Sequence, residues 1–124
     1  MFTAIAIFIG GGLGTLLRYC VTMLSNKYLT IPALGTFSVN IIGCLLIGYV
    51  LGYISQKADS IPHIAKLFLT VGFLGGLTTF STFSWEAFNF LKEGKIIQAL
   101  IYILSSLIIG LVATYIGFVL SKLN

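Results

Sequence analysis

The stretch that decides the fold is residues 72–84, Gly-Phe-Leu-Gly-Gly-Leu-Thr-Thr-Phe-Ser-Thr-Phe-Ser, in which three glycines precede five hydroxyl residues. Glycine and the β-branched threonine are poor residues for the interior of a continuous helix. We therefore expect a helix that breaks near residues 75–80. The alternative is an unbroken helix whose glycines allow close packing and whose hydroxyls bond back to their own backbone.

The sequence on either side of this stretch is too apolar for a protein surrounded by water. The 124 residues (13.4 kDa) are 58% hydrophobic and 8% charged, with a mean hydropathy of +1.09, whereas soluble domains carry about 25% charged residues. The net charge is +4, and the cations are dispersed along the chain. A soluble globule, a disordered chain and a nucleic-acid-binding protein are therefore excluded, and the expected surroundings are a lipid bilayer.

Four apolar stretches are each long enough to cross a membrane as a helix, which takes about 20 residues. We place these helices at about 2–25, 33–55, 62–91 and 96–122, with Pro32 and Pro62 at the starts of the second and third. The fold class is all-α integral membrane, with a single four-helix transmembrane domain over residues 1–124. The break in the third helix then falls at mid-membrane, where freed backbone groups are tolerated only if protein covers them or they line an ion site.

The charges at the two ends of the predicted bundle give no orientation. Three lysines fall at each end, with Arg18 leaning toward the second set: Lys57, Lys66 and Lys122 against Lys27, Lys92 and Lys95. The positive-inside rule therefore favours neither orientation of the chain in the membrane. Either another signal orients the chain, or the chain inserts both ways and can form a dimer about a two-fold axis in the membrane plane.

Polar side chains recur inside two of the other helices. Asn40 is an amide deep in the second helix, where it acts either as an interhelical clamp or as a pore-lining donor. Four positions of the fourth helix follow one another at four-residue steps and form one stripe: Tyr102, Ser106, Gly110 and Thr114. Its three hydroxyls either hold helices together or offer successive O–H donors to an anion that sheds its water.

Side chains that serve catalysis or metal binding are not grouped in any recognisable pattern. The single histidine, His63, lies at a helix start, and Cys20 and Cys44 lie in apolar stretches. No carboxylate pair, nucleophile–base set or metal-ligand spacing is present, so an enzyme is not expected. Arg18 either extends to the membrane interface or, since the chain has only three acids, favours anions over cations.

Three motifs of this chain resemble the Fluc (CrcB) family of fluoride channels. They are Gly14-Thr15-Leu16-Leu17-Arg18-Tyr19, Gly35-Thr36-Phe37-Ser38-Val39-Asn40-Ile41-Ile42-Gly43, and the stretch from Gly72 to Ser84 with its Thr-Thr-Phe-Ser-Thr-Phe core. The motifs fall in the first three predicted helices. The length and the four-helix plan also resemble the family over the whole chain.

The resemblance implies an antiparallel dual-topology homodimer with two antiparallel pores. It implies a central structural Na⁺ held by the backbone carbonyls of Gly75 and Thr78 from each subunit. It also implies a set of fluoride pore-lining residues: Asn40, Phe80, Phe83, Ser81, Thr82, Tyr102, Ser106, Thr114 and Arg18. Gly110 departs from the family pattern, which has a hydroxyl there, so either a water fills the gap or the track shifts to Ser105.

The expected function is passive export of cytoplasmic fluoride across the cell inner (plasma) membrane by a multi-pass protein. Hydroxyl, amide and aromatic-edge donors would replace the water of this small, strongly hydrated ion. One alternative is a small dual-topology proton-coupled exporter of cations, which needs a carboxylate within the membrane, and only Glu86 is a candidate. Another is a non-transporting membrane assembly protein, which explains the glycines but not the polar stripe.

Overall fold

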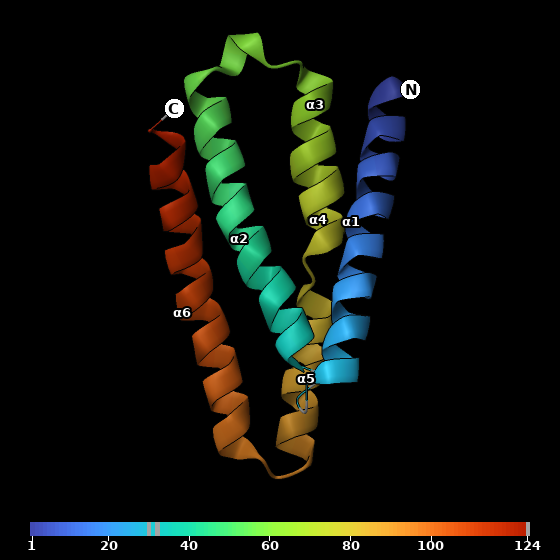
Figure 1. The fold of residues 1–124 in the computed structure, drawn as a ribbon, viewed down its shortest axis with the longest axis vertical. Coiled ribbons are helices and arrows are strands. Elements are labelled where there is room, and N and C mark those ends of the chain that lie inside the picture. Colours follow the sequence, from blue (N-terminus) through green and yellow to red (C-terminus); the bar gives the residue numbers. More distant parts are fainter. Residues whose placement is uncertain (30, 32, 124) are drawn as a thin grey trace.

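Long helices account for nearly all of the computed structural model, which describes residues 1–29, 31 and 33–123 (Figure 1). The elements are α1 (Phe2–Tyr28), α2 (Ala33–Gln56), the 3₁₀ turn η1 (Ala58–Ser60), α3 (His63–Leu67), the π-helical η2 (Phe68–Leu74), α4 (Gly75–Leu77), α5 (Phe80–Lys92) and α6 (Ile96–Ser121). Elements α3 to α5 follow one another as a single run, His63–Lys92. With α1, α2 and α6, this run makes four segments that are long and apolar enough to cross a membrane.

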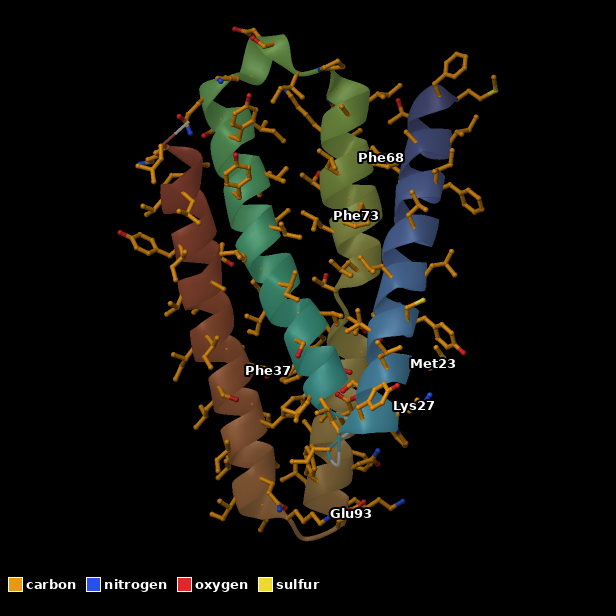
Figure 2. All side chains as sticks on the ribbon, viewed as in Figure 1. Met23, Lys27, Phe37, Phe68, Phe73 and Glu93 are labelled. Atoms are coloured by element: carbon orange, nitrogen blue, oxygen red, sulfur yellow. The ribbon has the colours of Figure 1, made fainter. Side chains whose placement is uncertain are left out.

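The four segments alternate in direction along the bundle. The first residues of α1, the turn η1 and the end of α6 lie at one end, and the α5–α6 loop lies at the other (Figure 1). Long apolar side chains point outward along α1 and α6 (Figure 2), where Phe8 and Leu111 are 82% and 74% exposed. Such outward apolar surfaces suit helices that face lipid.

The first helix runs to Tyr28, three residues beyond its predicted end at residue 25. Ser25, where this added turn begins, is buried against Gly35 of α2, so the turn is held by packing. The backbone N–H of Leu29 then donates to the Ser25 carbonyl and ends the helix. The predicted role of Pro32 at the start of the second helix lies outside the described residues.

Glycines bring the helix backbones into direct contact. A Cβ on Gly48 of α2 would collide with the Thr114 carbonyl of α6, and one on Gly117 of α6 would collide with the Leu45 carbonyl of α2. On the other side of the bundle, Gly10 of α1 faces the backbone of η2 in the same way. These glycines bring α1 and α6 against the inner helices without large side chains between them.

The third segment changes its backbone geometry twice. Residues Phe68–Leu74 form a π-helix, which the sequence did not predict, and α4 ends at Leu77. Thr78 (φ −86°, ψ 157°) and Thr79 (φ −150°, ψ 122°) are extended, and α5 begins at Phe80. Gly75 and Gly76 stay helical, so the extended residues span less than the predicted 75–80.

We expect Gly117→Leu to destabilise the subunit, because its side chain would be forced into the backbone of α2. Overpacking of this kind costs about 1–3 kcal/mol or more, so the variant should unfold at a clearly lower temperature in detergent. Gly12→Ala is the matched control, since a Cβ at Gly12 meets nothing within 4 Å. Equal melting temperatures for the two variants would contradict the close contact of α2 and α6.

Candidate functional site

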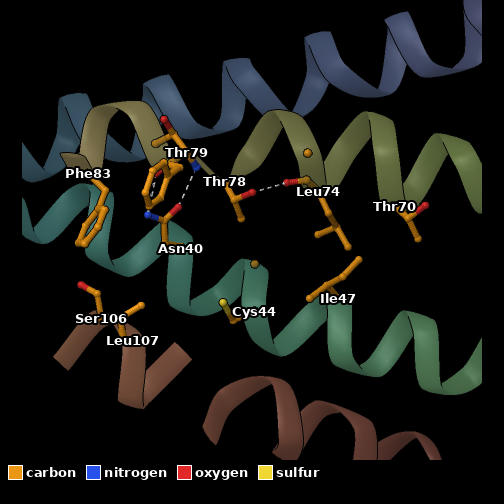
Figure 3. A pocket seen from close by; sticks show the side chains of 13 residues that line it. Asn40, Cys44, Ile47, Thr70, Leu74, Thr78, Thr79, Phe83, Ser106 and Leu107 are labelled. Carbon is orange, nitrogen blue, oxygen red and sulfur yellow. Dashed lines mark hydrogen bonds between the residues drawn. The ribbon is translucent and has the colours of Figure 1, made fainter. Parts of the chain in front are cut away.

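A cavity of about 380 Å³ lies beside the two extended threonines, between α2, α5 and α6 (Figure 3). Asn40 of α2, Phe80 and Phe83 of α5, and Ser106 of α6 line it, together with Thr78 and Thr79. The structure thus brings together four predicted pore residues from three helices. Its wall offers an amide, hydroxyls and aromatic rings in otherwise apolar surroundings.

The amide of Asn40 closes the gap that the extended backbone leaves. The Thr79 N–H donates to Asn40 Oδ1 at 2.8 Å, and Asn40 Nδ2 donates to the Thr79 carbonyl at 3.0 Å. Both backbone groups of Thr79 therefore find a partner on α2 (Figure 3). Asn40 acts as the interhelical clamp that was one of its two predicted roles, and its second Nδ2 hydrogen stays available to the cavity.

Arg18 reaches the same extended backbone from α1. Its Nη1 donates to the Thr78 carbonyl at 3.2 Å, so its side chain turns into the bundle and does not extend to the interface. A second cavity of about 330 Å³ surrounds it, lined largely by hydroxyl residues of α1, α2 and α5. Thr82 and Glu86 also line this cavity. The guanidinium keeps several N–H donors for a ligand there.

The hydroxyl of Thr79 starts α5 as its N-cap. Thr79 Oγ1 accepts from the Thr82 N–H at 3.3 Å and lies 3.1 Å from Thr82 Oγ1, an arrangement that supplies a partner to one of the free N–H groups of the first turn. Ser81 Oγ lies 3.3 Å from the same oxygen. Ser81 and Thr82 are exposed, and Ser81 lines none of the cavities described here.

Glu86 is part of the site, although its sequence position suggested a place near the end of the third segment. Thr36 Oγ1 of α2 donates to Glu86 Oε1 at 2.8 Å, and the Tyr102 hydroxyl of α6 donates to Oε2 at 2.7 Å. The carboxylate therefore joins α2, α5 and α6. One sequence signal was available: Glu86 follows Phe83 by three residues on α5, which places both on the same helix face.

A row of aromatic rings connects this carboxylate to the first cavity. Phe80 and Phe83 have ring centroids 5.8 Å apart, and Phe83 and Tyr102 have centroids 5.1 Å apart. Phe83 lines the 380 Å³ cavity, while Tyr102 lines a third cavity of about 520 Å³ that also includes Glu86 and Ser105. The rings thus stand between two cavities.

The three hydroxyls of the α6 stripe donate to different acceptors. Ser106 Oγ donates to the Tyr102 carbonyl at 2.6 Å, and Thr114 Oγ1 donates to the Gly110 carbonyl at 3.0 Å. Each hydroxyl has one hydrogen, so in this conformation Ser106 and Thr114 donate along their own helix, and Tyr102 donates to Glu86. Thr114 lines none of the cavities described here. A ligand would be bound only after these hydroxyls rotate.

The carbonyls of Gly75 and Thr78 have the donor chemistry that Na⁺ requires, since backbone oxygens at interrupted helices coordinate this ion. Gly75 is exposed, and it begins the short helix α4, which ends at Leu77 just before the extended residues. The Thr78 carbonyl accepts one bond, from Arg18, and keeps a second lone pair. The two oxygens have the chemistry of cation ligands, but the positive charge of the Arg18 guanidinium lies directly beside one of them.

The fold and the cavities together define a class: a multi-pass membrane protein with polar residues gathered inside an apolar bundle. The comparisons with known proteins identify it further. Residues 5–118 match the family model described as "CrcB-like protein, Camphor Resistance (CrcB)", and the chain belongs to this family.

Several relatives match over nearly the whole length. The chain is 44% identical to a fluoride-specific ion channel of Flavobacterium psychrophilum, 39% identical to one of Geobacter metallireducens and 36% identical to one of Aquifex aeolicus. Each alignment covers 98% of this chain and 98% of its relative.

We expect Asn40→Ala to lower the stability of the protein, because it leaves the buried N–H of Thr79 without a partner, whereas the Thr79 carbonyl, at the N-cap of α5, keeps the first bond of that helix. Each unsatisfied buried group costs about 1–3 kcal/mol. Thermal or denaturant unfolding in detergent measures the loss. Ser38→Ala on the neighbouring exposed face of α2 is the control, since Ser38 bonds only to the Leu34 carbonyl of its own helix. A variant as stable as this control would show that Asn40 is not the clamp.

Proposed function

We propose that this protein is a fluoride channel that lets cytoplasmic fluoride leave the cell passively across the plasma membrane. The observation that carries the proposal is the cavity in which Asn40, Phe80, Phe83 and Ser106 meet beside the extended residues Thr78 and Thr79. The names of the relatives, which are fluoride-specific ion channels, agree with it. A channel needs no catalytic group, and the family to which the chain belongs consists of ion channels and not of enzymes.

The cavity walls supply what a fluoride ion needs when it loses its water. The second Nδ2 hydrogen of Asn40 is a donor, and the hydroxyl of Ser106 becomes one when it rotates away from the Tyr102 carbonyl. The edges of Phe80 and Phe83 carry a partial positive charge. Each of these contacts is weak enough for the ion to leave again, as conduction requires. Tyr102, Thr114, Ser81 and Thr82 extend the path on either side, and Arg18 attracts the anion toward it.

A second copy of the chain completes the pores. Phe80 is 78% exposed although it lines the cavity, and Gly75, Ser81 and Thr82 beside it are exposed as well. A bilayer cannot solvate such a polar and backbone-rich surface, so another protein surface has to cover it. We infer an antiparallel homodimer, since three lysines lie toward each end of the chain and give neither orientation an advantage.

A structural Na⁺ sits at the centre of this dimer in our proposal. Gly75 is exposed, and the Thr78 carbonyl keeps one lone pair. Two copies would bring four such oxygens together where the third segments cross at mid-membrane. The ion would neutralise their converging dipoles and would not itself be transported.

Glu86 is the residue that a proton-coupled cation exporter would have to use. Its two oxygens accept hydrogen bonds from Thr36 and Tyr102, which stabilise the carboxylate as a link between helices. Neither this arrangement nor the relatives favour the exporter or the assembly protein, and the channel is the better explanation of the site.

The purified protein in liposomes should release fluoride rapidly and retain chloride. Phe80→Ile should slow fluoride efflux at least about tenfold, because loss of an aromatic edge that contacts the ion removes on the order of 1.4 kcal/mol. Phe88→Ile on the outer face of α5 is the matched control. A fluoride electrode measures the rate of fluoride efflux for both variants. Efflux no faster than from empty vesicles would refute the channel, and equal rates for the two variants would remove Phe80 from the path.

Inserted cysteines should report both orientations of the chain. In a background with Cys20 and Cys44 replaced by serine, Ser60→Cys and Asn26→Cys mark opposite ends of the bundle. A membrane-impermeant maleimide should label about half of each variant from outside sealed cells if neither orientation is preferred. Labelling of only one of the two positions would rule out dual topology.

A further inference from the structure

The polar stripe of α6 has a gap at Gly110, where no side chain is present. The packing of α6 against α2 does not require a glycine at this position. A Cβ at Gly110 would lie 3.4 Å from Cys44 Sγ and 3.9 Å from Ile41 Cδ1, which are ordinary contact distances. At Gly48 and Gly117, by contrast, a Cβ would collide with the backbone of the facing helix. Gly110 therefore leaves room for a small side chain between Ser106 and Thr114. The absence of a side chain at this position has to be explained by the group that lies opposite it.

The group opposite Gly110 is the thiol of Cys44 on α2. Cys44 follows Asn40 by one helical turn, so it lies on the same face of α2, and it lines the 380 Å³ cavity together with Asn40 and Ser106 (Figure 3). Within the described part of the chain, its Sγ makes no hydrogen bond, whereas Ser106 and Thr114 both donate to their own helix. The thiol is thus a donor in the cavity wall that is not already engaged.

We propose that Cys44 supplies the donor for the step of the ion path that Gly110 leaves empty. The anion would pass from Ser106 on α6 to the S–H of Cys44 on α2, the two groups that share the 380 Å³ cavity, and would leave this cavity in the direction of Thr114, which lies outside it. This inference rests on the proposed fluoride channel and names a specificity-determining residue within it. A shift of the track to Ser105 is a poorer explanation, because Ser105 lines the 520 Å³ cavity on the other side of the aromatic row.

The chemistry of the thiol sets the size of the expected effect. An S–H group is a weaker donor than a hydroxyl, so it contributes little affinity at this step. Replacement by a hydroxyl at the same position should keep or increase conduction, while loss of the donor should decrease it.

Fluoride efflux from liposomes tests the assignment with a set of matched variants. Cys44→Ala should slow efflux about two- to fivefold, in line with a weak donor, and Cys44→Ser should be at least as fast as the native chain. Cys20→Ala, on the exposed surface of α1, is the control and should match the native rate. Melting temperature and dimer content in detergent are measured alongside to show that each variant is folded.

The double variant C44A/G110S provides the discriminating result. It moves the donor back to α6, where the lost thiol leaves space for it, and should restore the native efflux rate. Native-like efflux by Cys44→Ala would overturn the proposal, and so would a Cys44→Ser variant as slow as Cys44→Ala or a double variant without recovery. An inactive native chain would instead refute the channel itself, so the two failures are distinguishable.

Discussion

The site depends on one constraint: the backbone groups of Thr78 and Thr79, which lie in the middle of an apolar bundle, need hydrogen-bond partners other than water. Asn40 satisfies Thr79 in both directions, and Arg18 satisfies the Thr78 carbonyl. Because these partners come from α2 and α1, the extended residues tie three segments of the chain together. In lipid an unpaired backbone group costs several kcal/mol, so the clamp keeps the polar residues of α5 at fixed places around the cavity.

Small residues make this arrangement geometrically possible. Gly10 allows α1 to approach η2 closely enough for Arg18 to reach Thr78, and Gly48 and Gly117 hold α6 against α2 so that Ser106 faces Asn40. The hydroxyls and the aromatic rings then lie on surfaces that the packing has already fixed. Binding groups placed by rigid elements in this way lose little entropy when an ion arrives.

Much of the fold could be predicted from the sequence, but the partners within the site could not. The four spans follow from hydropathy, and the density of Gly and Thr between Gly72 and Thr82 identified the segment with unusual backbone geometry. The bonds of Glu86 to Thr36 and Tyr102 join residues 50 and 16 positions apart, and no local pattern gives such pairs. Likewise, the first helix continues to Tyr28 because Ser25 packs against a glycine of the next helix, a contact that no local pattern of the sequence indicates. Where the hydroxyls of α6 donate depends on side-chain rotation, which sequence does not encode.

The π-helix η2 determines where the third segment can tolerate a change of length. A π-helical turn accommodates an extra residue relative to an α-helix, and in this chain the turn lies directly before the residues that line the cavity. Deleting one residue from Phe68–Leu74 would therefore let this turn relax to ordinary α-geometry and would leave the residues after it close to their present positions. A deletion after η2, where no extra residue is present, would instead turn the following helix by about 100° and carry Phe83 away from Asn40. The third segment can therefore lose a residue within η2 but not between η2 and the residues of the cavity.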